Sequence, residues 1–352
     1  MKYRDTHPRK VRGGSIHKTK SEKMYERKEK RQQLVAMPRE RFIEGLISAD
    51  EHEKAERKRV EDTFLTPEVD HFVAGPDVKT LSDRIKTWLK AGYPVHLIGP
   101  TGCGKTSLAI HTAKELGSPL VWINGDESIT TTDLIGGYSQ IEQESLRDQY
   151  IHNVMKSSDI LKAEWIDNPL AIACKYGYTL VYNEFSRTKP AANNIFLSIF
   201  EEGILELPTR FGGERYVKVH PDFKAIFTSN SVEYAGIHRP QDALLDRMVS
   251  LYMDFYSYDT EVKIVMAHTG VSRQDAKKIV GIVRSMRDRL PTAQKPGTRA
   301  CIMIGKGLRA LNGCDSLGFE QLCIDVIAAK TSSNVELIEK QGMVKDILKE
   351  LA

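Results

Sequence analysis

The 352-residue sequence has few cysteines, no long hydrophobic run and no internal repeat. Its five cysteines lack the C-x-x-C spacing of zinc and redox sites, which argues against a disulfide framework and for reduced thiols. No stretch of about 18 apolar residues is present, so we expect no membrane span. The first residues lack the apolar core of a signal peptide, and we therefore expect a cytoplasmic location.

The formal net charge of +4 is unevenly distributed, because residues 1–31 contain twelve Lys or Arg and only four Asp or Glu. This extension has few apolar residues and cannot bury a core alone. It is either a solvated tail or an arm that docks on nucleic acid or on an acidic protein surface. Aromatic residues suited to base stacking are nearly absent, so we favour the tail and expect no nucleic-acid partner.

One segment combines glycines with a Lys-Thr pair between a predicted strand, residues 95–98, and a predicted helix, residues 105–116. Its pattern, G-x-x-x-x-G-K-T, is that of a phosphate loop. The loop positions, with the serine that follows, are Gly99, Pro100, Thr101, Gly102, Cys103, Gly104, Lys105, Thr106 and Ser107. Glycines allow the tight bend that points successive N–H groups at phosphates near the positive end of a helix.

The two polar residues that follow the glycines predict what the loop binds. Lys105 would extend its ammonium to the β- and γ-phosphates, and the Thr106 hydroxyl would ligate the magnesium ion that bridges them. We therefore expect ATP and Mg²⁺ as cofactors, the alternative being a chance match in a glycine-bearing turn. Because Cys103 lies within the loop, we also expect an alkylating reagent to reach it and to block nucleotide binding.

Strand and helix patterns alternate along the middle of the chain. Further apolar strands are predicted at residues 120–123, 179–184, 223–230 and 248–253. Alternation of strands with helices predicts an α/β fold, in which a parallel sheet is flanked by helices and carries its sites at the carboxyl ends of the strands. A hairpin is expected between residues 205–207 and 216–219, and residues 132–167 are assigned to loop and helix.

After residue 253 the chain is predicted to be helical, with helices near residues 272–290, 299–311, 319–330 and 335–350. We therefore expect three parts: a basic N-terminal extension over residues 1–62, an α/β core over residues 63–255, and a small helical lid domain over residues 256–352.

Polar residues at the ends of two predicted strands are candidates for the rest of a nucleotide site. Glu184 would orient the attacking water, and Asn183 occupies the position where an Asp usually serves the magnesium ion. An amide oxygen can accept a hydrogen bond from a metal-bound water, but it brings no charge. Asn230 would contact the γ-phosphate or the water as a sensor. The alternative is that these residues merely finish strands and turns.

Two arginines are further candidates. Arg247 follows a short predicted helix, and presented to the nucleotide of a neighbouring subunit it would neutralise transition-state charge. Its alternative is an ordinary surface ion pair with Asp246 or another acid. Arg299 stands at a helix start in the predicted lid and would reach the γ-phosphate from there.

Taken together, these segments resemble the AAA+ ATPases of the MoxR-like branch over about residues 64–330. The segments that carry the resemblance are 99–106, Asn183-Glu184, 200–203, 228–230, 245–247 and 297–299. Within that branch, residues 91–98, 179–185, 226–230 and 241–248 are similar to the family of ATPases that serve gas vesicles.

The resemblance implies an AAA+ P-loop core with a helical lid, and a homo-oligomeric, hexameric ring with nucleotide at the subunit boundaries. It assigns phosphate and magnesium binding to the loop, the catalytic carboxylate to Glu184, the first sensor to Asn230, the arginine finger to Arg247 and the second sensor to Arg299. It also implies gas vesicle structural or accessory proteins as partners, and an association with gas vesicles. Asn183 departs from the broader pattern, which has Asp there.

Three functions are compatible with these residues. The first is an ATPase that drives gas vesicle assembly by remodelling vesicle proteins, with hydrolysis coupled to movement of the lid. The second is a nucleotide-gated scaffold with little hydrolysis, in which Asn183 has weakened magnesium binding. The third is a nucleic-acid-remodelling ATPase that uses the basic extension, and it predicts steep salt dependence. We favour the first.

Overall fold

The chain divides into two units, residues 1–63 and 64–352. The computed structural model describes residues 71–138, 142–145, 159–162, 165–207, 215–230, 238–311, 316–329, 331 and 333–350, all of them in the second unit. The predicted N-terminal extension therefore lies outside the described residues.

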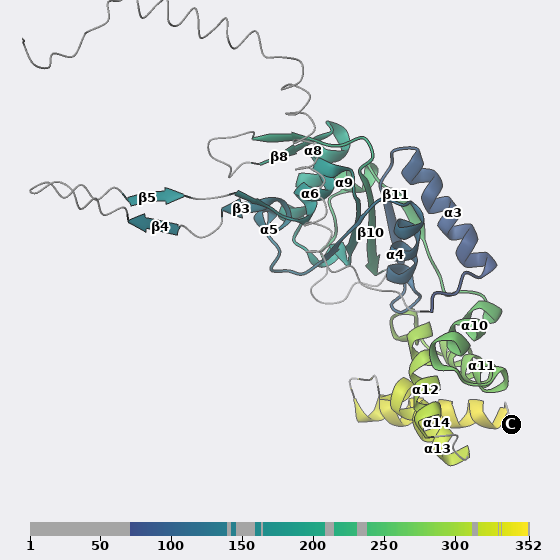
Figure 1. Cartoon of the computed structure of the whole chain (residues 1–352). Helices are drawn as coiled ribbons and strands as arrows, with labels where there is room; N and C mark the ends of the chain where they lie inside the picture. Colours follow the sequence, from purple (N-terminus) through teal and green to yellow (C-terminus); the bar gives the residue numbers. More distant parts are fainter. Residues whose placement is uncertain are drawn as a thin grey trace, which may run out of the picture. The chain divides into compact units, whose positions relative to one another are not determined.

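A parallel five-stranded sheet, which includes β10 and β11 of Figure 1, forms the centre of the second unit. Its strands lie in the order β11-β1-β10-β7-β2. The strands are β1 (Val95–Gly99), β2 (Leu120–Asn124), β7 (Thr179–Asn183), β10 (Lys224–Asn230) and β11 (Val249–Tyr252). All five residues of β7 are buried, as a strand covered on both faces requires. The predicted parallel sheet is confirmed, and each predicted strand is present.

Helices flank this sheet, as predicted. The first, α3 (Pro76–Lys90), and the helix that follows the phosphate loop, α4 (Lys105–Glu115), both contact β1. The others in this region are α5 (Thr131–Ile135), α6 (Pro169–Tyr176), α7 (Pro190–Asn193), α8 (Ile195–Glu201) and α9 (Asp242–Asp246), with a 3₁₀ turn at Phe185–Arg187. Residues 190–201 thus form two short helices, α7 and α8.

The assignment of residues 132–167 to loop and helix is wrong for much of that segment. After α5, strand β3 (Gly136–Tyr138) pairs antiparallel with β6 (Trp165–Asp167), and β4 (Glu142–Ser145) pairs antiparallel with β5 (Asp159–Lys162). These strands have only three or four residues, too few to show an alternating apolar pattern. The predicted hairpin is confirmed, with β8 (Ile204–Glu206) antiparallel to β9 (Tyr216–Lys218).

The C-terminal region is helical, as predicted. Its elements are α10 (Tyr258–Thr269), α11 (Arg273–Arg289), a 3₁₀ turn at Thr292–Gln294, α12 (Thr298–Ala310), α13 (Ser316–Cys323), a π-helical turn at Ile324–Ala328 and α14 (Asn334–Glu350). The patterns did not predict α10. Ser272 caps α11, where its hydroxyl accepts the Asp275 N–H at 3.1 Å. Among the described residues, no helix is long and apolar enough to cross a membrane.

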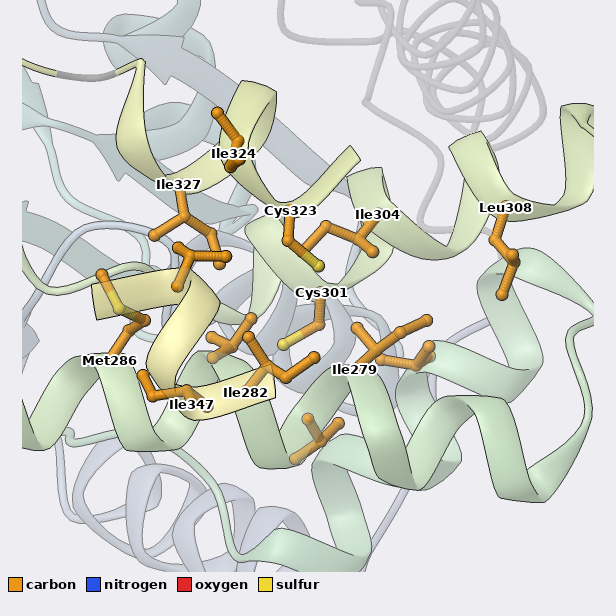
Figure 2. Close-up of a cluster of buried hydrophobic side chains, with 14 of the residues drawn as sticks. Ile279, Ile282, Met286, Cys301, Ile304, Leu308, Cys323, Ile324, Ile327 and Ile347 are labelled. Carbon is orange, nitrogen blue, oxygen red and sulfur yellow. The ribbon is translucent and has the colours of Figure 1, made fainter. Parts of the chain in front are cut away.

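A separate apolar core holds these C-terminal helices together (Figure 2). Ile279, Ile282 and Met286 of α11 and Ile304 of α12 all belong to this core, and each of the four residues is at most 1% exposed. Cys301 and Cys323 lie in the same core, and the cysteines of the described part of the chain are free thiols. The C-terminal helices therefore pack around an apolar cluster of their own.

Candidate functional site

A pocket opens at the carboxyl ends of β1, β7 and β10, where the sequence places the phosphate loop and the polar strand ends. Four groups of residues line it: the loop and the start of α4, the ends of β7 and β10, the segment before α3, and the C-terminal helices. They are residues 101–107, Asn183, Glu184, Thr228, Asn230, Phe72, Val73, Tyr256, Ile264, His268, Thr298, Arg299 and Ile302.

Strand register explains why the polar strand ends meet. Gly99 at the end of β1 pairs with Asn230 of β10, and Asn124 at the end of β2 pairs with Asn183 of β7. Because all these strands run in one direction, their carboxyl ends lie at the same edge of the sheet. The structure thus brings together residues that lie more than a hundred positions apart in the sequence.

The phosphate loop bends at the two glycines for which positive φ is observed, Gly102 (φ 76°) and Gly104 (φ 100°). Gly104 also caps α4, so the N–H groups of the first turn of α4 are free of helix bonds, and the residues of that turn line the pocket. A side chain at Gly104 would place its Cβ 3.1 Å from the Tyr256 ring. The loop therefore depends on glycine both for its bend and for its packing.

Lys105 is buried, and its ammonium donates to three oxygens: Gly99 O at 2.9 Å, Pro100 O at 2.8 Å and Asn230 Oδ1 at 3.1 Å. Burial is the main cause that lowers the pKa of Lys105. A desolvated ammonium is stabilised by a nearby negative charge, which phosphate oxygens would supply. Lys105 and Asn230, which the sequence predicted separately as site residues, therefore lie in direct contact.

The expectation that an alkylating reagent reaches Cys103 is wrong. The Cys103 side chain is fully buried, with its Sγ 4.0 Å from Met253 O. Burial raises the pKa of the thiol, and the thiolate is the reactive form. Although Cys103 belongs to the loop by sequence, its side chain packs into the core beneath it.

Asn183 is the centre of a hydrogen-bonded group. Its Oδ1 accepts from Thr106 Oγ1 at 2.6 Å and from Thr228 Oγ1 at 2.9 Å, and its Nδ2 donates to Asn124 Oδ1 at 2.7 Å. The two lone pairs of the amide oxygen are both in use. In this arrangement Asn183 holds the Thr106 hydroxyl.

The fit to a magnesium ion can be tested at Thr106. Because its hydroxyl proton is directed to Asn183, the lone pairs of the hydroxyl oxygen stay available to a hard cation. In the described part of the chain, no group of three or more His, Cys, Asp or Glu is placed to hold a metal. Magnesium usually binds through one or two protein groups together with substrate phosphates and waters. The residues present fit that manner of binding.

Glu184 lies just outside β7, and not within the strand as the sequence predicted. Its backbone is in the left-handed region, with φ 50° and ψ 39°. The carboxylate Oε2 lies 2.5 Å from Arg187 Nε, and the side chain is about one-third exposed at the pocket. The carboxylate therefore enters the pocket already paired with a cation.

The two candidate arginines occupy different places. Arg299 lines the pocket beside the loop, since its Cβ is 3.7 Å from the position of a Cβ on Gly102. Arg247 is not one of the described residues that line the pocket. It forms an ion pair with Glu201, and its Nη1 donates to Ala243 O at 2.7 Å. The predicted alternative for Arg247, a surface ion pair, is thus observed, with Glu201 as the acid.

A buried carboxylate fixes the segment that carries Arg299. Glu261 is fully buried and accepts from Arg287 at 2.7 and 2.9 Å, from Arg284 at 3.0 Å and from Thr298 Oγ1 at 2.7 Å. Arg287 also donates to Pro296 O at 2.7 Å. The start of α12 is thereby tied to α10 and α11.

Three residues at or beside the site were given no role from the sequence: Thr228 and Tyr256 line the pocket, and Asn124 accepts a hydrogen bond from Asn183. A signal for Thr228 existed in the sequence, because residues two apart on a strand share a face and Thr228 stands two before Asn230. Asn124 had no such signal, since its role depends on which strand lies beside β7.

A phosphate loop that connects strand β1 of a parallel sheet to α4, with residues of the C-terminal helices at the same pocket, defines an AAA-type P-loop ATPase. The family model of the AAA domain (dynein-related subfamily) matches residues 94–248. The resemblance to AAA+ ATPases of the MoxR-like branch is confirmed, and so is the predicted fold class.

Relatives that match almost the whole chain show which family of AAA+ ATPases it belongs to. Gas vesicle ATPase GvpN of Haloferax mediterranei is 48% identical over 97% of this chain and 96% of that protein. Gas vesicle ATPase GvpN1 of Halobacterium salinarum is 47% identical over 95% and 94%. A more distant MoxR-like relative, protein CbbQ of Hydrogenophilus thermoluteolus, is 25% identical over 68% and 86%. The chain belongs to the GvpN family of gas vesicle ATPases.

Proposed function

We propose that this protein hydrolyses ATP to ADP and phosphate in a Mg²⁺-dependent reaction, as a ring of identical subunits that remodels gas vesicle proteins during vesicle assembly. The observation that carries the proposal is the pocket in which the loop, Glu184, Asn230 and Arg299 meet. Fold likeness alone would leave the activity open, because one fold hosts many functions.

Within that proposal each residue has a role. The loop N–H groups and Lys105 bind the phosphates, and the Thr106 hydroxyl ligates Mg²⁺, which would neutralise charge on the phosphate oxygens. Glu184 orients the attacking water, and for this its carboxylate exchanges the contact with Arg187. Asn230 exchanges its bond to Lys105 for one to the γ-phosphate or the water. Arg299 contacts the γ-phosphate from the lid.

Arg247 is proposed to act on the nucleotide of a neighbouring subunit. Its position supports this role, because the guanidinium lies on the surface and does not line the pocket of its own subunit. The ion pair with Glu201 is partly exposed, and such pairs contribute only about 0–1 kcal/mol, so Arg247 can change partners at little cost. This supports a ring of subunits, and we take the number six from the resemblance to AAA+ ATPases.

The gas vesicle role is supported by the relatives, whose names state that they are gas vesicle ATPases. We propose that the partners are vesicle structural or accessory proteins and that the protein works in the cytoplasm at gas vesicles. We keep the predicted organisation as part of the proposal, with a basic extension over residues 1–62, a nucleotide-binding core over 63–255 and a lid over 256–352.

A second candidate, a nucleotide-gated scaffold with little hydrolysis, is favoured by one observation. The Asn183 amide brings no charge and its oxygen is occupied by two hydroxyls, so the site offers magnesium fewer anionic contacts than an Asp would. In this scaffold, ATP would order the ring without being consumed.

Assembly with and without nucleotide tests the proposal. The purified protein is examined by sedimentation and electron microscopy with ATP and Mg²⁺, and vesicle proteins that copurify are identified. We expect rings that retain a vesicle protein, and no ATP-dependent rings for Lys105→Ala, which lacks the phosphate-binding ammonium. A matched control is Lys345→Ala on α14, more than half exposed. A protein that stays monomeric at all ATP concentrations would contradict the proposal.

A further inference from the structure

Glu184 needs support from its surroundings, because its backbone lies where residues other than glycine are disfavoured. Two neighbours hold it. Gly125 approaches so closely that a Cβ there would lie 2.3 Å from Glu184 O, and its N–H donates to Asn183 O at 2.7 Å. On the other side, the Glu184 N–H donates to Thr228 Oγ1 at 3.1 Å.

The two partners of the Thr228 hydroxyl determine in which hydrogen bond it donates and in which it accepts. It donates to Asn183 Oδ1 at 2.9 Å, and an amide oxygen can only accept, so the proton of the hydroxyl is committed there. Its lone pair is then aimed at the Glu184 N–H. Since Asn183 also accepts from Thr106, the hydrogen-bonded series runs from the magnesium-binding hydroxyl to the backbone of Glu184.

We propose that Thr228 is a positioning residue for the reaction: its hydroxyl locks the backbone of Glu184 and so fixes where the carboxylate enters the pocket. This inference rests on the proposed ATP hydrolysis for its kinetic consequence. Thr228 is 1% exposed and lies on β10, where it is one of the residues that line the pocket. Nucleotide binding depends mainly on the loop and Lys105, whose contacts do not include Thr228.

Three variants separate positioning from packing. Thr228→Val keeps the shape and removes the hydroxyl, and Thr228→Ser keeps the hydroxyl and removes a methyl. Thr269→Val is the matched control, because Thr269 is also a buried threonine, hydrogen-bonded to Val265 O in α10 at 2.7 Å. Where valine prevents folding, Thr228→Ala replaces it and is expected to change the same quantities in the same direction.

Two readouts are compared. Hydrogen exchange is measured without nucleotide on a peptide that includes the Glu184 amide, and turnover is measured together with nucleotide affinity. For Thr228→Val we expect faster exchange and a kcat lowered roughly tenfold, as loss of one hydrogen bond predicts, with Kd within about twofold of wild type. Thr228→Ser and Thr269→Val should match wild type in both readouts.

The proposal is overturned if Thr228→Val leaves exchange and kcat unchanged, or if Thr228→Ser lowers kcat as much as valine does. The proposal is also overturned if Kd rises by the same factor by which kcat/KM falls, because Thr228 would then act in nucleotide binding. A wild-type protein without turnover would refute the proposed hydrolysis, whereas exchange at Glu184 would still decide whether Thr228 holds that backbone.

Discussion

Replacing Gly297 with alanine perturbs the contact between the C-terminal helices and the phosphate loop. A Cβ at this position would lie 2.7 Å from Thr101 O and 2.8 Å from Gly102 O. Both atoms belong to the backbone, so no side chain can rotate to relieve the clash. The backbone of Gly297 itself accepts alanine, since its φ is −80°. The segment that carries Arg299 must therefore move away from the loop.

The size of the effect follows from overpacking, which costs about 1–3 kcal/mol. If this cost falls on the nucleotide-bound state, Kd for ATP rises roughly 5- to 150-fold, because about 1.4 kcal/mol is tenfold. The assay is titration with a fluorescent ATP analogue, with melting temperature measured alongside to show that the fold is kept. Gly342→Ala is the control, since a Cβ there meets nothing within 4 Å.

Capping must be separated from the clash, because Gly297 is also the N-cap of α12. Gly297→Ser introduces the same Cβ and a good capping oxygen, so we expect it to weaken binding as alanine does. If serine binds like wild type, the loss came from the cap. If both variants bind ATP within twofold of wild type, the contact between Gly297 and the loop has no part in binding and the reasoning is refuted.

Three further outcomes are expected. Burial lowers the pKa of His96 to about 4, so the folded protein binds fewer protons than the unfolded chain as pH falls from about 6.5. Between pH 7 and pH 5 the free energy of unfolding should drop by about 2 kcal/mol from this group alone, and His96→Gln should remove that part of the pH dependence of the melting temperature. For Arg247→Ala we expect kcat to fall at least about a hundredfold while Kd for ATP stays unchanged, as for loss of an arginine finger. A change in Kd as large as the change in kcat would contradict a role in a neighbouring site. Modification of Cys103 by iodoacetamide should be slow in the folded protein and fast in denaturant, whereas fast labelling of the folded protein would contradict its burial.

Local patterns were enough to predict the sheet and the loop. The phosphate loop is contiguous, and its strand, glycines and helix are visible in one short stretch, so residues 99–107 could be assigned from spacing alone. The five strands of the sheet are apolar runs of ordinary length, which is why each was predicted. The short strands β3 to β6 were not predicted, because three or four residues are too few to show an alternating apolar pattern.

The contacts between site residues on different strands depend on the order of the strands in the sheet, which local sequence patterns do not predict. β10 inserts between β1 and β7, and this alone brings Thr228 to Glu184 and Asn230 to Lys105. Likewise, Asn124 contacts Asn183 only because β2 lies at the edge beside β7. The contact of Gly297 with the loop was also hidden, since it joins segments separated by almost two hundred residues.

Phosphate release from ATP tests the central claim, that Glu184 directs hydrolysis at this pocket, most directly. Steady-state release is measured with and without Mg²⁺ for the wild type and for Glu184→Gln, together with retention of bound ATP. We predict Mg²⁺-dependent turnover by the wild type, and for Glu184→Gln a loss of turnover of at least about a hundredfold with ATP still bound. Turnover by Glu184→Gln at the wild-type rate would contradict the claim.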